Sequence, residues 1–190
     1  MKISKRINCL ILIISLAFIF VGCNTNEHED QKIAKDWLNL YYTMGESDFE
    51  CYEKMNSGFK KEEAEEFISY LNEYKQKFKP FLSDSLYQNL EANRDFTLRI
   101  KEPYEEKYYI KVKSIEFEKY HEENIENTEK NTEQPLLVYY YTIELVQTSI
   151  SGDEIKTAKI RKQISLQKND NIWKVHLFRP IESPYFKTSI

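Results

Sequence analysis

The feature that most constrains this chain is a change in the spacing of its apolar residues near the middle of the sequence. In the first half they recur every three or four positions, as on one face of a helix, for example at Ile33, Trp37 and Leu40. In the second half apolar and polar residues alternate, as in a half-buried strand, for example at Tyr139 and Tyr141. A chain that forms helices first and antiparallel strands afterwards is expected to have an α+β fold.

Four helices are expected in the first half. The first ends before Gly45, and the second begins at the capping box formed by residues 47–50. The third covers about 62–78, because Pro80 prevents its continuation, and Ser83 is the expected N-cap of the fourth. One apolar stripe of the third helix is expected to lie in the core, and it consists of Phe67, Leu71, Tyr74 and Phe78.

The second half is expected to form strands joined by short turns. The alternating segments cover about 96–100, 108–117, 137–145, 160–166 and 173–177. A slip of the alternation at Ser114 predicts a β-bulge. Residues 151–153 and 169–171 have the composition of hairpin turns, and Pro180 ends the last strand.

An acidic segment interrupts the strands between Tyr120 and Pro135. It carries one apolar residue, Ile125, among glutamates, asparagines and threonines. This composition predicts a long solvated loop, because the segment has little apolar surface to bury. A loop at Glu122–Glu133 that binds a partner is the alternative interpretation.

The first 23 residues indicate export across the cytoplasmic membrane. Lys2, Lys5 and Arg6 precede an apolar run at 7–21, and the chain becomes polar directly after Cys23. A cationic start followed by a short apolar core is typical of a secretory signal. The core has about 15 residues, whereas a membrane-spanning helix needs about 20.

Residues 20–23, Phe-Val-Gly-Cys, resemble the lipobox of bacterial lipoproteins. The resemblance implies cleavage after Gly22 and acylation of Cys23, with palmitate as a typical chain, so that Cys23 becomes the mature N-terminus. It also implies that the protein is anchored by lipid on the outer face of the cytoplasmic membrane, where two acyl chains suffice. The alternative is an uncleaved membrane helix that ends near residue 23.

Charge and cysteine content limit the classes of partner and scaffold. The whole chain has a net charge of −4, and removal of the three cations of the signal leaves about −7, which argues against a nucleic-acid partner. Cys51 is the one cysteine left unmodified, so no internal disulfide or Cys-based zinc site is expected. Cys51 is expected to be a buried small hydrophobe. Scarce Gly and abundant Lys, Ile and Asn are typical of low-GC Gram-positive bacteria.

Several phrases of the sequence resemble the NTF2-like superfamily. They are Trp37–Tyr42, Gly45–Phe49, Phe81–Leu86 and Gln167–Val175. The resemblance implies N-terminal helices packed in a strongly curved antiparallel sheet, which together form a cone. The expected organisation is a signal peptide at 1–22, a lipidated tether at 23–30, an NTF2-like domain at 31–182 and a C-terminal tail at 183–190.

No catalytic, cofactor or metal site is expected from the residues. His28 lies in the tether, His121 in the acidic segment, and His176 on the outward side of the last strand. No spacing of His, Cys, Asp or Glu fixes a ligand set, and no phosphate-binding glycine loop occurs. Five aromatic residues are expected to face the inside of the cone, where they fill the core or line a pocket for a small apolar ligand: Trp37, Tyr41, Tyr139, Tyr141 and Trp173.

The expected function is a non-enzymatic lipoprotein that serves as a binding or accessory subunit of an envelope system. This rests on the resemblance, since NTF2-like domains serve in conjugation and secretion machinery. The expected partners are the bilayer, through acylated Cys23, and an envelope protein, with a homodimer through the outer sheet face left open. The alternatives are a small-molecule carrier that uses the cone, an isomerase- or dehydratase-like enzyme, and a toxin-immunity lipoprotein.

The lipobox interpretation predicts the effect of one substitution. Cys23→Ala should leave the full-length precursor uncut and without lipid, because acylation of this thiol precedes cleavage. Gel mobility and incorporation of a labelled fatty acid measure both effects. Normal cleavage after Gly22 in the variant would exclude the lipobox.

Overall fold

The computed structural model describes residues 28–56, 64–127, 132–181 and 185–186. The predicted signal peptide and Cys23 lie outside the described residues. The helical elements are α2 (Glu29–Tyr42), α3 (Glu46–Asn56), α4 (Ala64–Gln76), the 3-10 turn η2 (Lys79–Phe81), α5 (Asp84–Ala92), α6 (Asp95–Leu98) and α7 (Lys101–Glu105). Within these ranges, no helix combines the length and the apolar character needed to cross a membrane.

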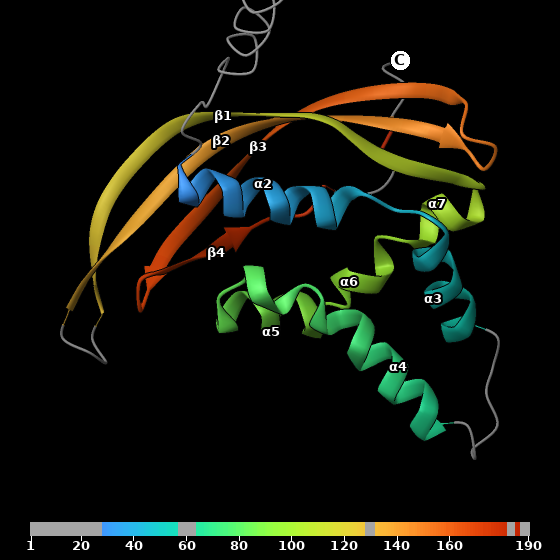
Figure 1. Cartoon of the computed structure of the whole chain (residues 1–190), viewed down its shortest axis with the longest axis horizontal. Helices are drawn as coiled ribbons and strands as arrows, with labels where there is room; N and C mark the ends of the chain where they lie inside the picture. The colour runs from blue at the N-terminus through green and yellow to red at the C-terminus, as the bar shows by residue number, and fades with distance from the viewer. Residues whose placement is uncertain (1–27, 57–63, 128–131, 182–184, 187–190) are drawn as a thin grey trace, which may run out of the picture.

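The strands follow all of these helices and form one sheet. They are β1 (Tyr108–Asn127), β2 (Thr132–Ser149), β3 (Glu154–Asn169) and β4 (Ile172–Phe178), paired in the order β1-β2-β3-β4 with every pair antiparallel. The sheet is open and curves over the helices (Figure 1). Helices followed by a four-stranded antiparallel sheet confirm the predicted α+β class.

Helix α2 lies on the concave side of the sheet and forms the centre of the core (Figure 1). It is buried along one face, through Ala34, Trp37, Leu38, Tyr41 and Tyr42, and it contacts β1, β3, β4 and η2. These positions recur at helical spacing, so a single stripe provides the whole contact with the sheet.

The pairing of β1 with β2 confirms the predicted bulge and shows that the acidic segment is not a long loop. The register of β1 against β2 shifts between Val112 and Ser114, as the slip in alternation predicted, and again between Lys119 and His121. The loop predicted between residues 120 and 135 was wrong, because β1 continues to Asn127 and β2 begins at Thr132. Backbone hydrogen bonds hold a two-stranded ribbon together without apolar side chains, so its composition can resemble that of a loop.

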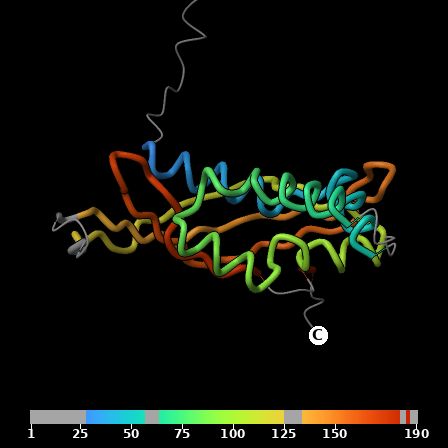
Figure 2. Tube along the Cα trace, turned by 90° about the horizontal axis from the view of Figure 1, so that it is seen from below, coloured from blue at the N-terminus to red at the C-terminus, as the bar shows by residue number. Residues whose placement is uncertain are grey.

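The paired ends of β1 and β2 form an arm that extends beyond the rest of the sheet. Strand β3 begins to pair with β2 at Leu136, so the arm beyond this residue is two-stranded. Figure 2 shows the arm reaching past the helices at one end of the molecule.

The strand predicted at about 96–100 was wrong. Helices α6 and α7 occupy this region, with Phe96 and Ile100 buried and Leu98 54% exposed. Phe96 and Ile100 are four residues apart, so they also lie on one face of helical backbone. Arg94 has a left-handed φ of 60° and separates α5 from α6.

The alternation of the last strand predicts that Leu177 faces the core together with Trp173 and Val175, and for Leu177 this prediction was wrong. The register of β3 against β4 shifts between Ser165 and Leu166, so the alternation slips near His176. As a result Leu177 is 52% exposed, and its neighbour Phe178 is 4% exposed.

Three other local predictions are confirmed. The Ser83 hydroxyl accepts a hydrogen bond from the Leu86 N–H and caps α5. Gly152 has a φ of 99° in the turn between β2 and β3. Asp170 and Asn171 have φ values of 49° and 65° between β3 and β4, as a type I′ turn requires.

Part of the predicted C-terminal tail belongs to the core. Tyr185 and Phe186 are buried, and the Tyr185 hydroxyl donates to the Arg99 carbonyl at 3.2 Å. The Lys156 amine donates to the Phe186 carbonyl at 2.8 Å. These contacts fix residues 185–186 beside Arg99, the C-cap of α6, and beside β3.

The slip in β4 predicts that alanine substitutions at two neighbouring residues differ strongly in their effect on stability. Phe178→Ala should lower the free energy of unfolding by about 3–5 kcal/mol, because this ring packs against Trp37 and Tyr41. Leu177→Ala should change it by no more than about 0.5 kcal/mol. Urea denaturation of both variants measures the difference. A larger loss for Leu177→Ala would contradict the register described here.

Candidate functional site

Four of the five aromatic residues predicted to face the inside of the cone lie in the core, and the fifth, Trp173, packs against it. Trp37, Tyr41, Tyr139 and Tyr141 are buried, and Trp173 is half-buried. The rings of Trp37 and Tyr41 are 5.1 Å apart. Phe178 packs edge-on against both of them, at 5.2 Å and 5.0 Å. This packing accounts for Trp37 and Tyr41 as core residues, and a pocket lined by the five aromatics stays a prediction.

The other three aromatics are spread along the sheet. The Tyr141 hydroxyl lies 3.4 Å from the Tyr42 hydroxyl, beside the end of α2. The Tyr139 hydroxyl donates to the buried Asp30 carboxylate, at the other end of α2. Burial, together with this hydrogen bond, raises the pKa of Tyr139. The two hydroxyls therefore fasten both ends of α2 to β2.

A buried ionic network lies on the side of α2 that faces the other helices. The Arg99 side chain is 2% exposed, and one of its terminal nitrogens is 2.7 Å from both the Asp48 carboxylate and the Tyr74 hydroxyl. Its other nitrogens donate to the carbonyls of Tyr41, at 2.5 Å, and Phe96, at 3.3 Å. The Tyr74 hydroxyl donates to Asp48 at 2.6 Å.

The Asp48 carboxylate is held in its ionised form. Burial alone would raise the pKa of Asp48, but Arg99 and Lys77, the Tyr74 hydroxyl and the Gly45 N–H together hold this pKa below its ordinary value. Lys77 lies 3.5 Å away, and the Gly45 N–H donates at 3.0 Å. A carboxylate stabilised in this way is a poor proton acceptor at neutral pH. The arrangement suits a structural role.

No sequence pattern predicts this network. Asp48 belongs to the predicted capping box, and its carboxylate accepts from the Gly45 N–H. Arg99 falls in the segment predicted as a strand, and it is 51 residues from Asp48, so no local pattern connects the two residues.

Cys51 is buried, as predicted, and its thiol stays protonated at neutral pH. It is 0% exposed, and burial raises the pKa of its thiol to about 11. At neutral pH it is therefore a thiol and not a nucleophilic thiolate.

The predicted non-functional histidines lie apart from one another. His28 and His121 are exposed, and His121 lies 3.1 Å from Glu123. His176 is half-buried near the slip in β4, and burial lowers the pKa of its imidazole. In the part of the chain that the structure describes, no group of three or more His, Cys, Asp or Glu is placed to hold a metal ion.

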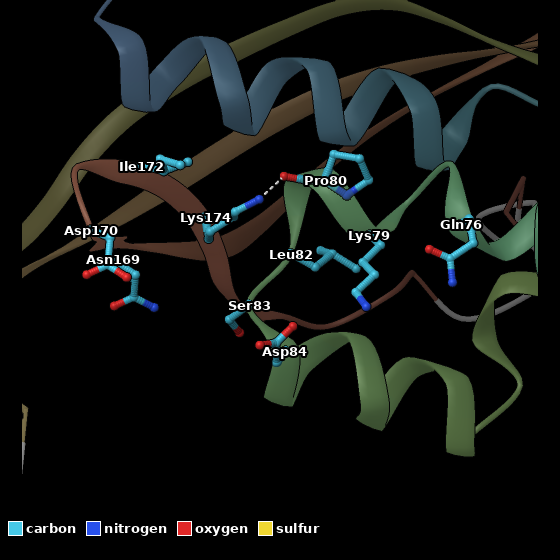
Figure 3. Close-up of a pocket in the computed structure, with 10 residues that line it drawn as sticks. All are labelled: Gln76, Lys79, Pro80, Leu82, Ser83, Asp84, Asn169, Asp170, Ile172 and Lys174. Atoms are coloured by element: carbon cyan, nitrogen blue, oxygen red, sulfur yellow. Dashed lines mark hydrogen bonds between the residues drawn. The ribbon is translucent and has the colours of Figure 1, made fainter. Parts of the chain in front are cut away.

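A polar hollow of about 420 Å³ lies where the start of α5 meets the turn between β3 and β4 (Figure 3). The Ser83 N–H donates to the Val175 carbonyl at 2.9 Å and docks the helix on the strand. The Lys174 amine donates to the Pro80 carbonyl across the hollow (Figure 3). The charged groups of its lining are Lys79, Asp84, Asp170 and Lys174. Two cations and two carboxylates leave the lining without a net charge.

A second hollow, of about 410 Å³, lies among α3, α4, α5 and α6. Its walls include Phe67 and Leu71, which were predicted to lie in the core and are instead half-buried. Tyr74 and Phe78, from the same predicted stripe, are buried as expected. The apolar stripe of α4 therefore continues past the core into this hollow.

Comparisons with known proteins identify no family. No family model matches the chain, and no curated protein matches it. Among solved structures, the chain is similar to a periplasmic fragment of TraM, with 11% sequence identity and a TM-score of 0.46 over 78% of this chain and 91% of that one. This TM-score is too low to establish a common fold.

The buried network predicts a pH-dependent loss of stability. Asp48→Asn should lower the free energy of unfolding by about 3–5 kcal/mol at pH 7, because Arg99 is left buried without its counter-charge. Since the folded-state pKa of Asp48 lies below its unfolded value, the stabilisation is complete above the ordinary carboxyl pKa of about 4 and is lost as the pH falls below it.

Urea denaturation at pH 7 and pH 3 measures this difference. The difference in free energy of unfolding between wild type and Asp48→Asn should be smaller at pH 3 than at pH 7. Glu116→Gln, at an exposed position on β1, is the matched control and should change stability by no more than about 0.5 kcal/mol at either pH. A gap that stays constant between the two pH values would contradict the role given to Asp48.

Proposed function

We propose that this chain is a lipoprotein of the outer face of the cytoplasmic membrane that acts, without catalysing a reaction, as a binding or accessory subunit of an envelope system. The observation that carries the proposal is the N-terminal run, in which Lys2, Lys5 and Arg6 precede an apolar segment that ends in Gly22-Cys23. Acyl chains on Cys23 would anchor the domain to the bilayer.

The short tether would hold the domain close to the membrane. Helix α2 begins at Glu29, only six residues after Cys23. Six residues span about 20 Å at most when fully extended. The end of the domain that carries Asp30 and Tyr139 would therefore face the bilayer, and a partner would be a membrane protein or another membrane-anchored protein.

The proposed fold family is the NTF2-like cone. A curved antiparallel sheet with α2 on its concave side supports this proposal (Figure 1). The central position of Trp37 and Tyr41 also supports it, because a cone needs an apolar helix at its axis. An accessory role follows by analogy with NTF2-like domains of conjugation and secretion machinery.

The proposed partner surface lies on the convex side of the sheet, where β1 and β2 lead into the arm. We call it the arm surface, and it consists of Glu118, Tyr120, Tyr140 and Arg161. Tyr120 is 61% exposed, and its ring lies 5.0 Å from that of Tyr140. The Arg161 guanidinium lies 4.0 Å from the Tyr140 ring and 2.6 Å from Glu118. Tyr and Arg in a pre-ordered cluster are the residue types that dominate binding energy at protein interfaces.

A non-enzymatic role is supported by the state of the buried reactive groups. Asp48 is held ionised by Arg99, and Cys51 is held as a thiol. Neither residue lines the two hollows described above. A general base or nucleophile would need a tuned pKa and access to a substrate.

Site-specific photo-crosslinking in native membranes tests the proposal. A photoreactive residue at Tyr120 should capture one protein in stoichiometric amount, because the ring is exposed in the arm surface. The matched control is Ile172, a similarly exposed residue at the start of β4, which should capture none. Mass spectrometry identifies the product, and a product of two copies of this chain would indicate a homodimer.

A substitution within the arm surface gives the second readout, because capture of the partner should depend on this surface. Arg161→Glu should reduce capture at Tyr120 about tenfold, because it places a like charge beside Glu118 and removes the cation that orders Tyr140. Equal capture at Tyr120 and Ile172, or no capture at either, would contradict the arm surface.

A further inference from the structure

We propose that the hollow among α3, α4, α5 and α6 is a binding site for a single-chain amphiphile with an anionic head. This inference does not depend on the lipid anchor or on a protein partner. It rests on the size, the apolar walls and the charge of the hollow, called here the helical hollow.

The walls of the helical hollow are apolar and come from three separate helices. Met55 lies near the end of α3, Phe67 and Leu71 lie on α4, and Phe96 lies on α6. The volume of about 410 Å³ falls within the range of small-molecule sites, roughly 300–1,000 Å³. Because the hollow is bounded on several sides, it suits a narrow chain; a partner helix would need an open, extended groove.

Helix α4 carries more apolar surface than the core covers. Phe67 and Leu71 on this helix are half-buried, and both line the helical hollow. Helix α4 leads away from the sheet (Figure 1), and Tyr74 is its one buried residue. The amphipathic character of α4 therefore exceeds what the core uses, and the unused part faces this hollow.

The charged groups of the lining select the head group. The Lys75 amine lies 2.7 Å from the Glu91 carboxylate, so this pair, which joins α4 to α5, is neutral as a unit. Arg94 is the remaining charge, and it is exposed. A lining with one excess positive charge, on a chain whose net charge is −4, is complementary to an anionic head group.

The backbone holds Arg94 in place beside the walls. Its φ of 60° is uncommon for a residue with a β-carbon. Its carbonyl accepts hydrogen bonds from the N–H groups of Thr97 and Leu98, at 3.0 Å and 2.9 Å, and from the Thr97 hydroxyl at 3.0 Å. The cation is thus attached to a fixed turn at the edge of an apolar hollow, which is the arrangement that an amphiphile needs.

A carboxylate and a phosphate head would both fit this description. A free fatty acid provides the first, and an alkyl phosphate provides the second. Arg pairs with either group through two parallel hydrogen bonds. The shared class is a single acyl or alkyl chain with an anionic head, and the experiment separates the two sources.

Photo-affinity labelling of the full chain in lipid nanodiscs tests the site. Three probes share a ten-carbon chain with a terminal diazirine and carry a carboxylate, a phosphate or a hydroxyl head. The anionic probes should label peptides that contain Met55, Phe67 or Leu71 in a saturable manner, and excess decanoate should compete with them. The stronger of the two anionic probes identifies the head group.

Two variants and one control connect the labelling to the geometry. Arg94→Gln should reduce labelling by the anionic probes about tenfold, because it removes one charge-assisted contact. Arg179→Gln removes an exposed arginine directly after β4 and should leave labelling unchanged. Leu71→Trp should fill the hollow and abolish labelling by every probe. Near-ultraviolet circular dichroism confirms that each variant is folded.

Two results would overturn the proposal. One is the absence of saturable labelling at the helical hollow by either anionic probe. The other is equal labelling by the hydroxyl probe, or labelling that Arg94→Gln leaves unchanged, because the site would then have no anion selectivity.

Discussion

The arrangement of the helices depends on one buried cation. The Arg99 guanidinium lies between the end of α2, the start of α3, the end of α4 and the start of α6, and it contacts a group from each of them. A guanidinium taken out of water is costly unless every donor has a partner, so these four elements can pack only in an arrangement that satisfies it. Asp48 supplies the counter-charge, and the Tyr74 hydroxyl and the carbonyls of Tyr41, Thr43 and Phe96 accept from the remaining donors.

The curvature of the sheet is the second constraint, and it decides where binding sites can exist. The sheet bends over α2, and the rings of Trp37, Tyr41 and Phe178 pack against one another beneath it. The two hollows lie elsewhere, one beside the turn between β3 and β4 and one among the outer helices. Phe67 and Leu71 on α4 therefore remain available beside one hollow, and the exposed Tyr120 ring lies on the convex side of the sheet.

These two surfaces suit different ligands for physical reasons. The arm surface lies on the convex side of the sheet and carries an exposed Tyr120 ring beside an ordered cation and carboxylate, which favours a folded protein partner. The helical hollow is concave and apolar, with Arg94 at its edge, which favours a small amphiphile. A protein held near a bilayer by Cys23 would encounter both kinds of ligand.

The sequence by itself determined the features that depend on neighbouring residues: the order of helices and strands, the cap at Ser83, the bulge near Ser114 and the turn at Asp170–Asn171. Each follows from local backbone and side-chain preferences. Only the tertiary structure decided that the acidic segment pairs as strands, that Phe96 lies on a helix with Ile100 as the N-cap of the next, and that the core ends partway along α4. Strand pairing and the limits of the core depend on contacts between residues far apart in the chain, as in the pairing of Arg99 with Asp48, and the spacing of residue types does not identify those partners.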